Sequence, residues 1–119
     1  MRTTSFALDR NRLVRVLKET DISKQIRSLL FQVGGLPIKI AGGAYQRPGI
    51  SDFLVCLDGR FVAIEVKRPG LQMTEKQEQF QHEVRAAGGI AFVAYSVDDV
   101  VRELDLNVKL YPMFARGRK

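Results

Sequence analysis

The dipeptide Asp58-Gly59, placed between two apolar runs, constrains the fold more than any other feature of the sequence. The first run covers residues 53–57 and the second covers residues 61–64. An Asp-Gly pair between two such runs is the strongest short signal of a β-hairpin with a two-residue turn. We therefore expect two adjacent antiparallel strands in the middle of the chain.

Three charged residues are expected to meet at the open end of this hairpin. Glu65 and Lys67 follow the second run, and side chains two residues apart on a strand leave it on the same face, about 6.6 Å apart along the backbone. Antiparallel pairing brings Asp52, which precedes the first strand, toward the same end. Two carboxylates beside a lysine are what a divalent metal ion and an activated water require.

A buried structural salt bridge is the alternative interpretation of the Glu65/Lys67 pair. Apolar residues occupy both faces of the second run, which predicts a central strand covered on both sides. Charges on such a strand cost free energy unless they are paired or bound to a metal. The third charge, on Asp52, favours the metal site over the simple pair.

Residues 19–33 have a helical period, and one polar residue extends the apolar face of this expected helix. Glu19 lies three residues before the first apolar position, so we expect it to point toward the sheet. The alternative is a carboxylate at a helix start, favoured there by the helix dipole. The apolar face consists of Ile22, Ile26, Leu29, Leu30 and Val33.

A second helix is expected from about Thr74, a good N-cap, to Ala87, where Gly88-Gly89 stops it. Gln77 lies inside its apolar stripe and is expected to face the same sheet as the charged residues. The alternative is an amide that hydrogen-bonds to backbone groups. The stripe consists of Met73, Gln77, Phe80, Val84 and Ala87.

With these residues in place, the chain resembles the PD-(D/E)xK nuclease superfamily. More narrowly, it resembles a stand-alone VRR-NUC domain, a type common in phages and also found at the end of larger repair nucleases. The resemblance covers residues 19–104. It rests on the order helix, strand, strand, strand, helix, strand, and on four stretches at Glu19 with Ile22 and Ile26, at 47–52, at 64–70 and at 74–77, followed by 87–94. Ser51 stands where the family usually has proline before the metal-binding aspartate.

The resemblance implies an α/β fold with a mixed central sheet flanked by helices in the order αβββαβ. It also implies hydrolysis of phosphodiester bonds in DNA with Mg²⁺ or Mn²⁺. Asp52 and Glu65 are expected to bind the metal with the backbone carbonyl near Val66, and Glu19 is expected to support a water or a second ion. These are oxygen ligands, which both metals prefer.

The remaining members of the implied catalytic set act on the water and on the substrate. Lys67 is expected to orient the attacking water and to stabilise transition-state charge. Gln77 would brace Lys67 or the water. Arg47, Lys67 and Arg68 are expected to contact nucleic acid. Arg47 follows the glycine pair Gly42-Gly43, which permits either a tight turn or a close approach to a phosphate.

Composition agrees with a nucleic-acid partner. The formal net charge is +6 and the isoelectric point is about 9.8, which favours polyanions. Basic residues gather at the two ends of the chain, where they either contact phosphates or form solvated tails. They are Arg2, Arg10, Arg12, Arg15 and Lys18, then Arg116, Arg118 and Lys119.

Several other classes of protein are not supported by the sequence. The single cysteine, Cys56, excludes an internal disulfide and is expected to be a small buried hydrophobe. The single histidine, His82, falls on the polar side of the second helix, and there is no Cys/His cluster for zinc. No apolar run reaches the length of a membrane span, and no signal-peptide core is present, so we expect a cytoplasmic or other intracellular protein, in the host cytoplasm if it is phage-encoded.

We expect one nuclease domain over residues 1–119, with a core at about 19–104 and basic extensions. A homodimer is also expected, since apolar residues at the ends either form a subunit interface or fold back onto the sheet. The stretch 106–111 alternates apolar and polar residues, as an edge strand or an interface segment does. The apolar residues are Leu13, Val14, Val16 and Leu17, then Leu106, Val108, Leu110, Tyr111 and Phe114.

Three functions are consistent with this sequence. The first is a metal-dependent DNA endonuclease, either structure-specific or nicking. The second is a four-way (Holliday) junction resolvase, which shares the same site chemistry. The third is a non-catalytic nucleic-acid-binding module, which would be expected to lose at least one of Asp52, Glu65 or Lys67.

Overall fold

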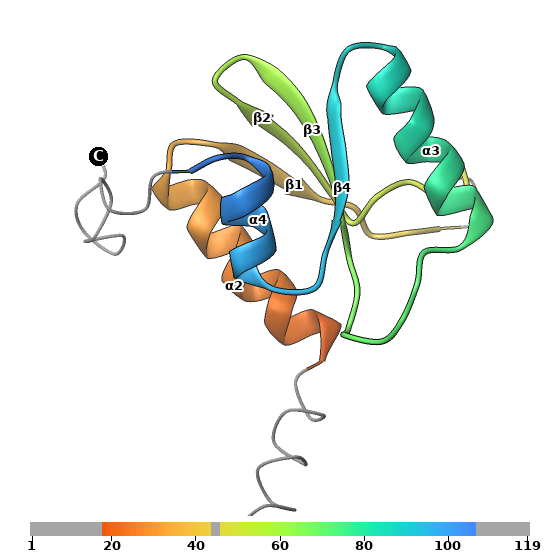
Figure 1. The fold of residues 1–119 in the computed structure, drawn as a ribbon, viewed down its shortest axis with the longest axis horizontal. Helices are drawn as coiled ribbons and strands as arrows, with labels where there is room; N and C mark the ends of the chain where they lie inside the picture. Colours follow the sequence, from red (N-terminus) through yellow and green to blue (C-terminus); the bar gives the residue numbers. More distant parts are fainter. Residues whose placement is uncertain (1–17, 44–45, 107–119) are drawn as a thin grey trace, which may run out of the picture.

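The computed structural model describes residues 18–43 and 46–106, and they form a three-layer α/β arrangement around one mixed sheet (Figure 1). The order of elements is α2 (Glu19–Gln32), β1 (Leu36–Lys39), β2 (Phe53–Leu57), β3 (Arg60–Val66), α3 (Glu75–Ala86), β4 (Ile90–Ala94) and α4 (Val97–Glu103). This agrees with the αβββαβ order expected from the sequence, with α4 added.

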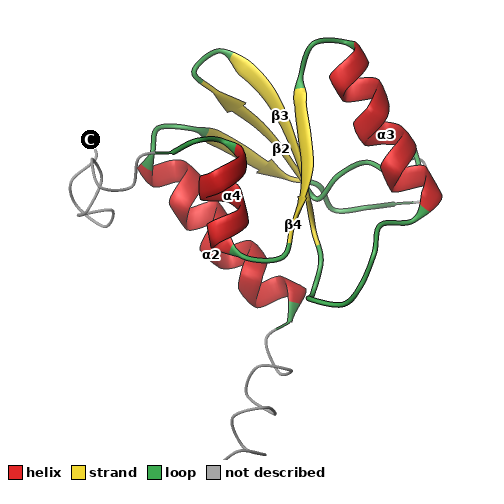
Figure 2. Ribbon diagram, in the orientation of Figure 1, coloured by secondary structure: helices red, strands yellow, loops and turns green. Residues whose placement is uncertain are grey.

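The four strands lie in the order β1-β2-β3-β4. The pairs β1/β2 and β2/β3 are antiparallel, whereas β3/β4 is parallel and connected through α3. A parallel pair needs a crossover of this kind, because the chain must return from the end of one strand to the start of the next. Helices α2 and α4 cover one face of the sheet and α3 covers the other (Figure 2).

The Asp58-Gly59 turn forms as predicted. Both residues have positive φ values, 53° and 76°, the combination that a two-residue hairpin turn of type I′ requires. The turn sets the register in which Phe53 pairs with Ile64 and Leu57 pairs with Arg60. This register brings the start of β2 to the end of β3, where the candidate site lies.

The main core lies between the sheet and the α2/α4 layer. Residues of β2 and β3 that alternate toward this layer, such as Val55, Val62 and Ile64, are almost completely buried. A smaller cluster on the opposite face consists of Ala63, Val84 and Ala91 and lies under α3. Glu65 and Asp52 belong to this second face, because they alternate with the residues of the main core.

One sequence expectation is wrong: Cys56 is exposed rather than buried. The side chains of β2 alternate, so that Phe53, Val55 and Leu57 face α2 while Cys56 faces the other side. Helix α3 covers that side over β3 and β4 only. Leu36 and Phe61, the cross-strand partners of Cys56, are therefore exposed as well, at 57% and 48%.

Element boundaries differ little from those expected. Helix α2 ends at Gln32 with Val33 as its C-cap, one residue before the end expected from the helical period over 19–33. Leu106 packs on the main core after α4, whereas residues 107–111 of the expected edge segment lie outside the described residues. The basic and apolar residues at positions 2–17 and 108–119 also lie outside them. None of the helices in the described part of the chain is long and apolar enough to cross a membrane.

Candidate active site

Asp52 is held at the junction of three strands. Its Oδ2 accepts a hydrogen bond of 2.7 Å from the backbone N–H of Val66, at the end of β3. Its backbone carbonyl accepts a hydrogen bond of 2.8 Å from the N–H of Ile40, just after β1. The Val66 N–H therefore holds the carboxylate, and the pairing with Ile40 holds the backbone that carries it.

Glu65 lies on β3 beside Asp52 and is only 3% exposed. Within the described residues, its Oε1 is buried and has no hydrogen-bond partner. Burial, the negative charge of Asp52 and a hydrogen bond shared with Asp52 raise the pKa of Glu65 from 4.5 to about 8. At neutral pH and without a cation, this carboxyl group therefore keeps its proton.

Lys67 emerges from the same face as Glu65, directly after β3. Its backbone N–H donates to the carbonyl of Ala94 at 3.1 Å, which extends the β3/β4 pairing by one residue. The side chain is half-buried, and its positive charge lowers the pKa of Glu65, against the larger effect of burial. Asp52, Glu65 and Lys67 thus converge at one end of the sheet.

Glu19, the first residue of α2, is half-buried and approaches this site from the other helix layer. Its charge makes a small contribution to raising the pKa of Glu65. It does not complete a cluster, since the described part of the chain holds no group of three acidic, histidine or cysteine side chains close enough for one metal ion. Within the described residues, Glu19 therefore does not join Asp52 and Glu65 as a third close carboxylate.

Gln77 has a local contact in this structure. Its Oε1 accepts a hydrogen bond of 2.8 Å from the N–H of Thr74, and its own N–H donates to the hydroxyl of Thr74 at 3.2 Å. These two bonds form a capping box at the start of α3. The side chain matches the alternative of an amide bonded to backbone, and its expected role toward Lys67 stays a prediction.

Sequence reasoning missed Gln81, the fully buried amide of α3. Its Nε2 donates to the carbonyl of Phe92 at 2.7 Å, and its Oε1 accepts from Arg85 at 3.0 Å. Arg85 also donates to the carbonyl of Ala91 at 3.1 Å. These bonds join α3 to β4. The available signal was the spacing, because Gln81 lies three residues before Val84 on the same helix face.

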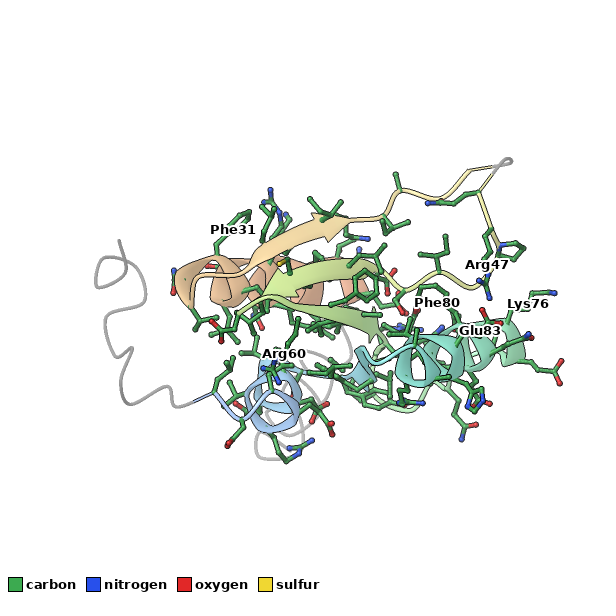
Figure 3. All side chains as sticks on the ribbon, turned by 90° about the horizontal axis from the view of Figure 1, so that it is seen from above. Phe31, Arg47, Arg60, Lys76, Phe80 and Glu83 are labelled. Atoms are coloured by element: carbon green, nitrogen blue, oxygen red, sulfur yellow. The ribbon has the colours of Figure 1, made fainter. Side chains whose placement is uncertain are left out.

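The long β1–β2 loop is attached to α3 by Arg47. Its guanidinium contacts Glu83 at 2.8 Å and lies 5.3 Å from the centre of the Phe80 ring. Figure 3 labels these three side chains in the view from above. Hydrogen bonding to Arg47 also lowers the pKa of Glu83. Arg47 therefore contacts protein groups here, while the expected nucleic-acid contact Arg68 is exposed.

Together with Asp52, the loop encloses an open pocket of about 430 Å³ at the site. Its lining residues are Ile40, Gly42, Gly43, Gln46, Arg47, Pro48, Gly49, Ile50 and Asp52. The glycine pair forms part of this wall, so backbone groups line the approach to Asp52. Such a wall lets a phosphate backbone come close to the carboxylate.

Gly49→Ala is expected to destabilise the protein by about 3 kcal/mol or more. Gly49 has a φ of 86°, and a Cβ atom there would overlap the backbone carbonyl of Lys76. Urea denaturation measures the change, and Gly59→Ala is the matched control. Gly59 has a φ of 76° but faces open space, so only the backbone cost of about 1–2 kcal/mol is expected there. Equal losses in both variants would show that the loop does not pack on α3.

The donor set fits a hard divalent cation. One carboxylate oxygen of Glu65 is buried and has no partner in the part of the chain that the structure describes. Asp52 offers Oδ1, which lies 3.9 Å from Lys39 Nζ. Burying an unpaired carboxylate oxygen is costly, and a cation would compensate for it. Two carboxylates and the nearby backbone carbonyl of Val66 suit Mg²⁺ or Mn²⁺, which usually keep several waters.

Comparison with solved structures finds a VRR_NUC domain with the same fold. The TM-score is 0.65 at 26% sequence identity, and the match covers 77% of this chain and 99% of that chain. The fold class and the resemblance expected from the sequence are thereby confirmed. No protein-family model and no curated protein matches the sequence.

Proposed function

Since the chain is a VRR-NUC domain protein, and this domain is of the nuclease type, we propose that it is a Mg²⁺- or Mn²⁺-dependent DNA endonuclease that hydrolyses phosphodiester bonds. The observation that carries the proposal is the pair Asp52 and Glu65, with its unpartnered buried oxygen, next to Lys67. We further propose a single nuclease domain over residues 1–119, with its core at about 19–104, acting inside the cell.

In the proposed mechanism, the residues of the site divide into metal ligands and groups that act on the water and the phosphate. Asp52, Glu65 and the Val66 carbonyl would hold the metal. When bound, the metal would act as a Lewis acid on the phosphate and lower the pKa of a bound water. Asp52 is pre-positioned by the Val66 N–H, and Glu65 must lose its proton before it can act as a ligand. The deprotonation makes activity dependent on pH.

Lys67 is proposed to orient the attacking water and to stabilise the negative charge that develops on the phosphate in the transition state. Its place on the face of Glu65 supports this role, since its charge already acts on that carboxyl group. Glu19 is proposed to position a water from the α2 side. Gln77 fixes the start of α3 and is proposed to brace Lys67 through that helix.

Cleavage is expected to depend completely on a divalent metal. With a panel of linear duplex, supercoiled plasmid, flap, single strand and four-way junction, Mg²⁺ or Mn²⁺ should support cleavage and EDTA should abolish it. Ca²⁺, which is larger and looser in geometry, should support binding better than turnover. The reaction is followed on gels.

The same panel separates the three candidate functions. Selective, symmetric cutting of the junction would indicate a resolvase, whereas nicking of plasmid would indicate a simpler endonuclease. Binding of DNA without cleavage in any metal would identify a non-catalytic module. Undiminished cleavage in EDTA would contradict the metal site at Asp52 and Glu65.

We also propose a homodimer, because a double-strand or symmetric junction cut calls for two sites related by a two-fold axis. Exposed apolar side chains on the uncovered part of the sheet support it. Leu36, Cys56 and Phe61 are cross-strand neighbours, and Ile38 is 51% exposed on the same face. Light scattering at micromolar concentration should give the dimer mass. Ile38→Asp should shift it toward the monomer, and a monomer mass that persists with DNA bound would contradict the proposal.

A further inference from the structure

A second pocket lies on the opposite side of β1 from the pocket at the β1–β2 loop. It has a volume of about 350 Å³ and is lined by Thr20, Ser23, Lys24, Arg27, Lys39 and Phe53. Three of these six residues are cationic and two carry hydroxyl groups. No part of the proposed catalytic mechanism uses Lys24, Arg27 or Lys39.

The pocket is built by one face of α2 and the end of β1. Thr20, Lys24 and Arg27 follow each other at intervals of four and three residues, which places them in one row on the helix. Arg27 stacks over Phe31, with 5.1 Å between its guanidinium carbon and the ring centre. The Phe31 ring therefore orients the guanidinium group of Arg27 but, unlike a carboxylate, accepts no hydrogen bond from its N–H groups.

Lys39 pairs with Asp52, whereas the other two cations of the pocket, Lys24 and Arg27, have no carboxylate partner in the described part of the chain. Asp21 lies close by in sequence, but its carboxylate accepts a hydrogen bond from the N–H of Lys18. The wall of the pocket is mostly apolar, and its three cationic side chains are exposed, so they can attract an anion to this surface from around the pocket.

Lys39 connects this pocket to the candidate active site. Its ammonium lies 3.9 Å from Asp52 Oδ1 and 5.7 Å from the centre of the Phe53 ring. The residue therefore borders both the carboxylate pair and the cationic pocket. Lys39 is thus the residue through which an anion in the pocket could approach the Asp52 carboxylate around the end of β1.

We propose that this pocket binds a backbone phosphate of the substrate strand beside the scissile phosphodiester, with Lys24, Arg27 and Lys39 as the cationic contacts. The inference rests on the proposed function for the nature of the substrate. A nucleic-acid strand supplies phosphates in series, so one phosphate at the metal site brings a neighbour within reach of an adjoining pocket. The pocket then fixes the path of the strand across α2.

The test measures DNA binding separately from cleavage. Affinity of a fluorescein-labelled duplex and of the matching single strand is measured by anisotropy in Ca²⁺ over a range of salt concentrations. The slope of log K against log salt is negative, and each lost phosphate contact reduces its magnitude by about 1. Arg27→Gln and Lys24→Gln should each reduce the magnitude of this slope by about 1 and weaken binding several-fold at low salt.

Arg60→Gln is the matched control, because Arg60 is an exposed cation at the hairpin end of β3 and loses the same charge. It should leave the slope unchanged, and thermal melts should show all three variants folded. Equal slopes in the pocket variants and the control would contradict the proposal that the pocket binds a phosphate. A wild-type protein that binds no DNA would contradict it as well. If wild type binds but cuts no DNA, a slope of smaller magnitude in the pocket variants would keep the pocket and reject the nuclease. Metal-dependent cutting with equal slopes would reject only the pocket.

Discussion

Replacing Lys67 with alanine is expected to reduce DNA cleavage at least about 100-fold while the protein stays folded and binds DNA. The reason is that Lys67 is the cation on the face of Glu65 and Asp52, where charge would develop in the transition state. Single-turnover rates in Mg²⁺ measure the loss, and anisotropy in Ca²⁺ measures binding. Urea denaturation should show an intact fold, since the Lys67 backbone alone makes the bond to Ala94.

Lys76→Ala is the control for this variant. Lys76 is an exposed lysine on α3, and its side chain points away from the sheet in Figure 3. It should cut at close to the wild-type rate. The loss of Lys67 should also raise the pKa of Glu65 further, so the pH midpoint of Mn²⁺ binding should move upward. Near wild-type cleavage by Lys67→Ala would contradict the mechanism, and unfolding of the variant would favour a structural salt bridge.

The sequence was sufficient to predict the central part of the fold, because that part depends on local signals. The Asp58-Gly59 turn fixes the register of β2 and β3, and this register alone brings Asp52 to Glu65. Thr74 caps α3 as predicted from its position before the helical stripe. The meeting of the two carboxylates is therefore a consequence of turn geometry and strand alternation.

Features that depend on contacts between distant segments were not predictable in this way. Helix α4 has only seven residues, and its buried Val100 shows that it is stabilised by packing on the core. The exposure of Cys56 depends on how far α3 extends over the sheet, which no property of β2 encodes. Arg47 pairs with Glu83, 36 residues away, so the attachment of its loop is visible only in the structure.

Glu65→Gln is expected to stabilise the metal-free protein at pH 9 by about 2–4 kcal/mol and to abolish its stabilisation by Mn²⁺. The folded pKa of Glu65, about 8, lies above its ordinary value of 4.5. The folded state therefore holds a proton that the unfolded state has released between these two values. This difference in proton binding makes the stability of the folded protein depend on pH. The stability that Glu65 contributes is fully present below pH 4.5 and is lost as the pH rises through 8.

Glutamine keeps the neutral form at every pH, so the two proteins should be about equally stable at pH 4.5 and diverge above it. Adding Mn²⁺ should reverse their order, since the metal binds the folded wild type by displacing the proton and has one carboxylate less in the variant. Urea denaturation at several pH values, with EDTA or Mn²⁺, measures both effects. Glu83→Gln is the control: hydrogen bonding to Arg47 lowers the pKa of Glu83, so its removal should give no gain at pH 9. A wild type as stable as Glu65→Gln at pH 9 without metal would show that burial at β3 does not oppose the Glu65 charge, and would remove the reason for a cation at this site.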